Sequence, residues 1–248
     1  MRTLIALTRT ELRLLTREWA AMLFAFAFPA LMLVVLAGVF GDLPDPEGFG
    51  AAIPSEHYVA SYIAIPLGAL ALVGLPVMLA SYRERDVLRR FAAFGVPAGA
   101  VVAAQALVSA LLVLAGVAVV LLVAAPTYGI PTPADPVTVV AGFVLGTVTM
   151  LAIGVALGLA ASTARAAQAI GLLAFFPMWL LGGGPPQRVM SGAMVSVADV
   201  LPLTHAISAV RDPWLFEGAA TGADLLALGV WLTGALVVVG MLLRRRPQ

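Results

Sequence analysis

Cysteine and lysine are absent from this chain of 248 residues, and histidine occurs only twice, as His57 and His205. Without cysteine, disulfide bonds and thiolate metal sites are excluded. The two histidines lie far apart in sequence, so a metal site would need several distant carboxylates to converge on one of them. Neither histidine falls within a long apolar run, where an intramembrane hydrolase would need a base beside its nucleophile. We therefore expect no metal site and no catalytic residues.

A phosphate-binding loop is also missing. The pattern GxxxxGK[ST], whose backbone amides and lysine hold nucleotide phosphates, does not occur, and no lysine follows the glycine run at 182–184. The chain is therefore expected to bind no cofactor and to have no enzymatic activity of its own. Any ATP, with its Mg²⁺, would have to be held by a partner subunit.

Charge is scarce. Charged residues make up 11% of the sequence and hydrophobic residues 62%, and the mean hydropathy is +1.04. A water-soluble fold of this size could not cover so much apolar surface, and no polar segment is long enough to form a core of its own. The net charge of +1 gives no reason to expect nucleic acid as a partner. Residues 1–248 are predicted to form a single membrane domain.

Six apolar runs are long enough to cross a hydrocarbon core about 30 Å thick, which takes about 20 helical residues. They are apolar all round, which favours helices over the alternating strands of a barrel. The sequence thus predicts an all-α polytopic membrane protein with six transmembrane helices. The predicted spans are residues 19–40, 58–82, 99–125, 137–161, 166–184 and 225–243.

Twelve of the fourteen arginines lie on one side of these spans. They precede the first span, separate the second from the third and the fourth from the fifth, and follow the last. By the positive-inside rule, both termini are cytoplasmic. A cleaved signal peptide, the competing interpretation of the first forty residues, should have a shorter apolar core of about 7 to 15 residues.

The span interiors contain no charged residue, whereas ion-coupled carriers commonly place one near the midplane. This disfavours secondary transport, although sodium sites built from carbonyls and hydroxyls remain an alternative. Gly146, Gly154 and Gly158 recur at helical spacing, with Gly171 nearby. Small residues let helices approach closely, so we interpret these glycines as packing positions rather than as the lining of a pore.

The segment before the first span, Thr3 to Glu18, is predicted to form an amphipathic helix. Arg9, Arg13 and Arg17 recur every four residues on one face, and leucines gather on another. Such a helix should lie in the membrane interface. It serves either as an anchor on anionic lipid or as a helix that also touches a cytoplasmic partner.

The loop between the second and third spans, residues 82–97, reads YRERDVLRRFAAFGVP. Its apolar residues recur at helical spacing and its charges of both signs lie opposite them, so we predict a short amphipathic helix that Gly95 and Pro97 terminate. A solvated positive loop would need neither the interleaved acids nor the apolar face. Mixed charge with apolar knobs favours docking to a protein surface.

This loop resembles the stretch E-R-E-x-G-T-L-R-R-L followed by P-V/L-S in ABC-2 type export permeases. Glu84 to Phe91 and then Phe94 to Pro97 carry the likeness, although Asp86-Val87 replaces the usual Gly-Thr and Gly99 replaces a hydroxyl residue. The resemblance implies that this segment couples the permease to its ATPase. The implied coupling residues are Arg83, Glu84, Arg85, Asp86, Val87, Leu88, Arg89, Arg90 and Phe91.

The segment Gly182 to Trp214, between the last two spans, contains two apolar stretches too short to cross a membrane, separated by Gly and Pro. They are interpreted as short re-entrant helices, with a lipid-skimming loop as the alternative. The segment is similar to the outer-leaflet helices of the same family. The likeness implies an extracellular gate formed by Pro202, Thr204, His205 and Arg211.

The resemblance as a whole implies the permease subunit of an ATP-driven exporter. Its partners would be an ABC ATPase subunit on the cytoplasmic face, a second copy or a paralogous permease, and membrane lipids. The uncharged spans favour a hydrophobic or amphiphilic cargo, such as a drug-like molecule or a lipid. The Ala-, Val- and Arg-rich composition is typical of a bacterial genome, so the expected location is the bacterial plasma membrane. A non-transporting membrane scaffold or a secondary carrier is the alternative.

Overall fold

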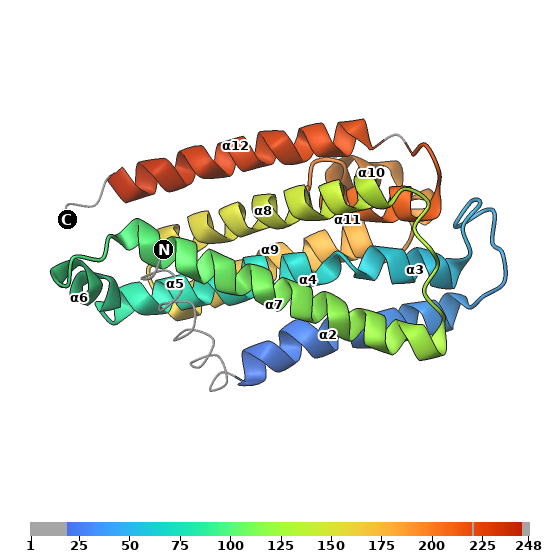
Figure 1. Ribbon diagram of the computed structural model, residues 1–248. Coiled ribbons are helices and arrows are strands. Elements are labelled where there is room, and N and C mark those ends of the chain that lie inside the picture. The colour runs from blue at the N-terminus through green and yellow to red at the C-terminus, as the bar shows by residue number, and fades with distance from the viewer. Residues whose placement is uncertain (1–18, 220, 245–248) are drawn as a thin grey trace.

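The computed structural model describes residues 19–219 and 221–244, and in this part of the chain every regular element is a helix. The long helices run roughly side by side in an elongated bundle (Figure 1). Five of them are continuous: α2 (Trp19–Phe40), α7 (Ala98–Thr127), α8 (Pro136–Ala160), α9 (Ala164–Gly183) and α12 (Gly222–Arg244).

The sixth long run, Pro54–Glu84, is helical but irregular. It consists of α3 (Pro54–Tyr62), α4 (Ile65–Ala69), the π-helical segment η1 (Leu70–Gly74) and α5 (Leu75–Glu84). The remaining elements are shorter: α6 (Val87–Ala93), the 3₁₀ turn η2 (Gln187–Val189), α10 (Gly192–Ala198) and α11 (Pro202–Leu215).

The predicted fold class is confirmed. Each of the six predicted spans lies on one long helical run, and the ends differ by at most four residues. Within the described residues, five runs meet the length and apolarity needed to cross a membrane. The remaining predicted span, α2, is a helix of 22 residues. Helices α10 and α11 pass the same test together but meet at 90°, which fits either a broken span or a re-entrant loop.

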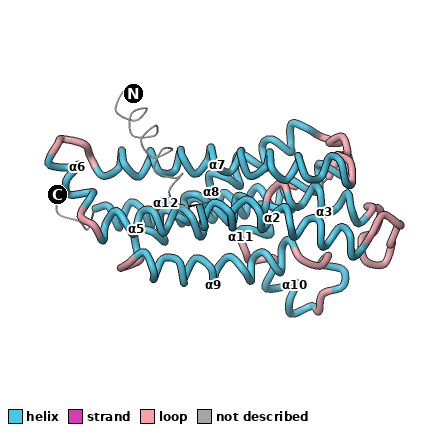
Figure 2. Tube along the Cα trace, turned by 90° about the horizontal axis from the view of Figure 1, so that it is seen from below, coloured by secondary structure: helices cyan, strands magenta, loops and turns pink. Residues whose placement is uncertain are grey.

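The irregular second span is the centre of the bundle. Tyr58, Tyr62, Leu67, Leu72 and Leu79 along it are all fully buried. Helices α7 and α9 lie on opposite sides of the bundle (Figure 2). Burial on all sides lets this span depart from α-helical geometry, because neighbouring helices rather than lipid surround its displaced carbonyls.

Two prolines explain where the second span departs from α-helix. Pro66 has no N–H for the carbonyl of Tyr62, and the helix breaks between α3 and α4. Farther along, the N–H of Leu75 donates to the carbonyl of Leu70, five residues back, and Pro76 has no N–H to give. Neither Leu75 nor Pro76 therefore donates a hydrogen bond to the Ala71 carbonyl.

Glycines in the neighbouring helices accommodate these displaced carbonyls. The Cα of Gly154 in α8 lies against the carbonyl of Ala71, and Gly171 in α9 lies against that of Leu72. Gly142 of α8 meets the Ala209 carbonyl of α11 in the same way. A Cβ at any of these positions would collide with the facing oxygen. The interpretation of the span glycines as packing positions is confirmed.

The outer surface of the bundle is apolar along its length. Large exposed side chains occur on α7, α8, α9 and α12, among them Leu122, Leu173, Leu226 and Val230. Water would penalise so much contiguous apolar surface, whereas hydrocarbon does not. The two ends of the bundle differ. One carries α6 and is called here the α6 end; the other carries α10 and is called the α10 end (Figure 1).

The contact at Gly154 yields a stability prediction. Gly154→Ala places a methyl group against the Ala71 carbonyl, and overpacking of this kind costs about 1–3 kcal/mol. We expect a lower thermal unfolding midpoint in detergent, measured by intrinsic fluorescence. Gly240→Ala on α12, where nothing lies near the added Cβ, is the matched control and should leave the midpoint unchanged or slightly higher. Equal midpoints for the two variants would contradict the packing role.

Candidate functional site

At the α6 end, the predicted amphipathic helix is two elements instead of one. Helix α5 continues to Glu84, the chain turns at Arg85, and Asp86 takes a left-handed backbone conformation with φ of 55°. Aspartate tolerates that conformation better than most residues because its short side chain can bond locally. Helix α6 starts only at Val87, so Arg83 and Glu84 belong to the second span rather than to α6. The prediction of a continuous Arg83-to-Phe91 helix is wrong.

Helix α6 ends as the sequence predicts. Gly95 has φ of 77°, and the N–H of Val96 donates to the carbonyl of Phe91 at 2.9 Å. A left-handed glycine followed by this 6→1 hydrogen bond is the usual way to terminate a helix. The turn at the other end is held by Arg90, whose Nη2 donates to the carbonyl of Arg85 at 2.8 Å.

Arg83 is half-buried and Glu84 is exposed, but both side chains bond to neighbouring helices. The guanidinium of Arg83 donates to the carbonyls of Gly158, Leu159 and Ala161 where α8 ends. The carboxylate of Glu84 accepts the N–H of Ala164 at 3.0 Å, at the start of α9. Both side chains are therefore engaged inside this chain.

The other predicted coupling residues divide by exposure. Arg85, Asp86 and Arg90 are exposed, while Val87 and Phe91 are half-buried. The side chains of Leu88 and Arg89 lie outside the described residues. Phe94, just beyond α6, is 84% exposed. The set of coupling residues taken from the resemblance ends at Phe91 and so misses this residue, although its helical spacing marks it.

At the α10 end, the bent pair α10–α11 carries the predicted gate residues. The hydroxyl of Ser191 accepts from the N–H of Met194 at 3.4 Å and begins α10, and Pro202 is the first residue of α11. Pro202 and Thr204 are buried, and Thr204 packs against Gly182 near the end of α9. Tight packing at this corner holds the hairpin against the fifth span.

His205 joins three segments at the same end. Its Nδ1 lies 2.7 Å from Oδ1 of Asp224 on α12, and its Nε2 lies 2.9 Å from the carbonyl oxygen of Asp199. His205 of α11 thereby contacts both α12 and the residue that follows α10. Trp231 of α12 adds another link by donating to the carbonyl of Val200 at 3.1 Å.

Arg211 stays within its own helix. Its Nε donates to Asp212 at 2.7 Å and its Nη2 to the hydroxyl of Ser208 at 3.2 Å. Among the described residues, no hydrogen bond joins Arg211 to His205. The end of α11 is fixed differently, because Trp214 donates to the carbonyl of Pro131 at 2.8 Å in the loop before α8.

Asp135 caps α8 in that loop. Its N–H donates to the carbonyl of Pro213 at 2.9 Å, and its carboxylate accepts from both the amide and the hydroxyl of Thr138. The hydrogen bond from the Thr138 hydroxyl and, to a smaller extent, the one from the Thr138 backbone N–H hold the pKa of Asp135 below its ordinary value. The bond to Pro213 thus ties the α7–α8 loop to α11.

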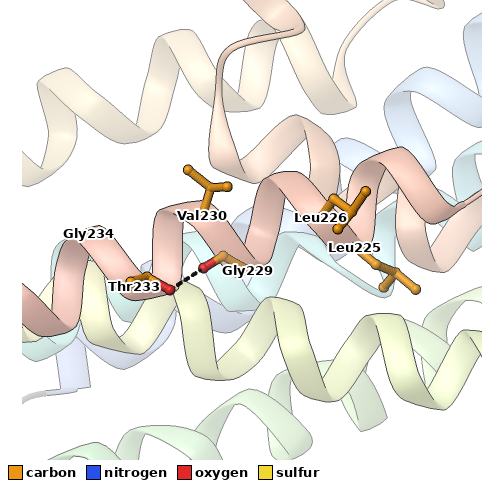
Figure 3. Close-up of a pocket in the computed structure, with 6 residues that line it drawn as sticks. All are labelled: Leu225, Leu226, Gly229, Val230, Thr233 and Gly234. Atoms are coloured by element: carbon orange, nitrogen blue, oxygen red, sulfur yellow. Dashed lines mark hydrogen bonds between the residues drawn. The ribbon is translucent and has the colours of Figure 1, made fainter.

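The remaining candidate sites are the predicted interfacial helix, a groove on α12 and any cluster of metal-binding side chains. Arg9, Arg13 and Arg17 of the predicted interfacial helix lie outside the described residues. A shallow, open groove on α12 is lined by apolar and small side chains, with Thr233 bonded to the carbonyl of Gly229 at 2.8 Å (Figure 3). It offers no charged group and suits a hydrocarbon environment. Across residues 19–219 and 221–244, no three side chains of the metal-binding types gather at one place.

The order of these features agrees with a comparison against known families. The profile of the ABC-2 type transporter family matches residues 2–214, which includes the first five spans, α6, α10 and nearly all of α11. The chain belongs to that family and is a multi-pass transporter permease component, the membrane part of an ABC transporter. No curated protein matches the sequence.

The link between His205 and Asp224 can be measured by a double-mutant cycle. His205→Ala and Asp224→Ala should each lower the thermal unfolding midpoint, and the double variant should lose less than the sum. We expect a coupling energy of about 1 kcal/mol. Asp199→Ala is the control, since His205 bonds the main chain of Asp199 rather than its carboxylate. Strict additivity would show that the pair contributes nothing in the membrane protein.

Proposed function

We propose that the chain is the permease subunit of an ATP-driven exporter and that a separate ABC ATPase docks on its α6 end. The observation that carries the proposal is the apolar ring of Phe94, 84% exposed beside the mixed charges of Arg85, Asp86 and Arg90. Members of this family generally work with such an ATPase, which supports the assignment of the partner.

The α6 end is cytoplasmic in this proposal. Arg83, Arg85, Arg90, Arg165 and Arg244 belong to the helix ends and turns that gather there (Figure 1). The acidic residues of the 41–53 loop and of the gate hairpin lie toward the opposite end. Arginine on the cytoplasmic side follows the positive-inside rule, and a cytoplasmic ATPase can reach only that side.

The exposed residues have different roles in docking. A large apolar ring entering a groove on the ATPase supplies most of the affinity, because fully desolvated aromatic anchors are typical hot spots. Exposed charges around it steer encounter and fix orientation more than they add affinity. Arg83 and Glu84 stay bonded to α8 and α9, so the contact surface starts at Arg85.

The cargo in this proposal is hydrophobic or amphiphilic, and it leaves the cell past the α10–α11 hairpin. Support comes from the uncharged interior of the spans and from the buried, largely apolar contacts at the gate. Two permease chains, identical or paralogous, surround the path. ATP-driven movement of α6 shifts the spans between inward-open and outward-open states.

Docking through Phe94 is tested by co-purification of the tagged permease with the ATPase encoded beside it. Phe94→Ala should weaken binding on the order of tenfold, or about 1.4 kcal/mol, because it removes the exposed anchor. Arg85→Glu should also weaken binding, and this loss should be larger at low salt than at high salt. Phe216→Ala, an exposed phenylalanine at the opposite end, is the control. If even the natural chain binds no ATPase, the chain is a scaffold or a secondary carrier.

Cargo class is tested in proteoliposomes that contain the permease and its ATPase. We expect ATP-dependent movement of fluorescent lipid analogues or of lipophilic dyes, since the spans offer apolar surface and no buried ionic group in their interiors. Small hydrophilic ions such as rubidium serve as comparison cargo. Movement of those ions alone would reject the hydrophobic cargo.

A further inference from the structure

Three helix ends meet tightly at the α6 end of the bundle. Gly158 in the last turn of α8 packs against Pro76 and Leu79 of α5. Ala80 of α5, Ala161 after α8 and Ala167 of α9 form a small buried cluster of their own. Alanine and glycine at these positions let the three backbones approach closely, which places the side chains of the next turn of α5 within reach of both neighbours.

Arg83 lies one turn beyond Ala80 and occupies the end of α8. The last carbonyls of a helix have no amide partners within it and carry the negative end of the helix dipole. The Nη1 of Arg83 lies 2.6 Å from the carbonyl oxygen of Leu159, 2.5 Å from that of Ala161 and 3.4 Å from that of Gly158. Through this one nitrogen, a cation thus serves carbonyls at the end of a helix that belongs to a different span.

Glu84, the next residue, makes the opposite contact with α9. The first amides of a helix lack acceptors and carry the positive end of the dipole. Thr163 serves one of them by accepting from Ala166 at 3.1 Å, and the carboxylate of Glu84 accepts from Ala164 at 3.0 Å. The adjacent, oppositely charged residues Arg83 and Glu84 therefore bind the C-terminal end of α8 and the N-terminal end of α9.

We propose that Arg83 and Glu84 are positioning residues that lock the α8–α9 turn to the end of the second span, so that a displacement of α6 is passed directly to α8 and α9. This inference rests on the proposed function for the source of the displacement, but the lock itself is a property of the permease alone. Only two residues, Arg85 and Asp86, separate α5 from α6.

The lock completes a route from the docking surface to the gate. Toward the α10 end, Gly142 and Gly146 of α8 lie against Ala209 and Ala206 of α11. The hydroxyl of Thr149 donates to the carbonyl of Leu228 on α12 at 3.2 Å. A shift of α8 therefore reaches both helices that His205 and Asp224 join, without any contact between the gate and the ATPase.

The lock is tested first on the permease without ATPase, reconstituted in nanodiscs. Because the natural chain has no cysteine, Ala93→Cys on α6 and Ser162→Cys in the α8–α9 turn give one pair of spin labels per chain, and both positions are exposed. The labelled chain is diluted with unlabelled chain so that only the distance within one chain is measured. Double electron–electron resonance should show one narrow distance. Arg83→Gln should broaden or shift it, because the guanidinium bonds are lost.

Matched variants separate the lock from a general loss of charge or of folding. Arg165→Gln removes an exposed arginine from the first turn of α9 and should leave the distance narrow. Arg83→Lys keeps a cation with N–H donors at the end of α8 but changes its shape and reach, so it should restore part of the order. An unchanged distance in Arg83→Gln overturns the proposal, as does equal broadening in Arg165→Gln.

Transport then measures the consequence. In proteoliposomes with the ATPase, Arg83→Gln should lower the cargo moved per ATP hydrolysed on the order of tenfold, a typical size for a coupling term, while Phe94→Ala should lower hydrolysis and transport together. If Arg83→Gln moves as much cargo per ATP hydrolysed as the natural chain does, the role of Arg83 in coupling is overturned. Failure of all forms to bind ATPase would reject the proposed function but leave the spin-label result as the test of the lock.

Discussion

A main-chain carbonyl in hydrocarbon has no water to bond, and this constraint organises the whole bundle. Most spans meet it by α-helix, which bonds a carbonyl to the amide four residues ahead, although Pro29 in α2, Pro126 in α7 and Pro177 in α9 each remove one such bond. In the second span and at the end of α8, another part of the protein covers the carbonyls that lack an amide. The Ala71 and Leu72 carbonyls rest on glycine Cα atoms, and the end of α8 is bonded by Arg83. The π-helical segment of the second span is thus placed where the chain itself covers it.

This constraint also explains the position of the second span. A helix with Pro66 and Pro76 leaves carbonyls without helical partners, which would be costly on a lipid-facing surface. Placed at the centre, the same helix has α8, α9 and α11 packed around it. The glycines of α8 and α9 follow from that choice, because only a residue without a Cβ lets a displaced carbonyl approach so closely.

The sequence alone predicts the features that depend on local composition. Span positions follow from hydropathy, and the end of α6 follows from Gly95. The packing role of Gly146, Gly154 and Gly158 follows from their spacing. The sequence does not predict the partners of Arg83 and Glu84, which lie about 75 to 80 residues away in the chain. In the sequence those residues read as part of one charged helix, because nothing local marks the left-handed turn at Asp86 or shows that α5 extends to Glu84.

Packing restricts how the second span can move. If α5 slid along α8 by a fraction of a turn, the Ala71 carbonyl would leave Gly154 and meet the Cβ of a neighbouring residue, and the Leu72 carbonyl would likewise leave Gly171. Close-packed interfaces of this kind have discrete arrangements rather than a continuous range. The lower-cost motion keeps α5, α8 and α9 in register and moves them together. The bonds of Arg83 and Glu84 at one end and the glycine contacts in the middle favour the same rigid group, which is what the proposed transmission of a movement from α6 requires.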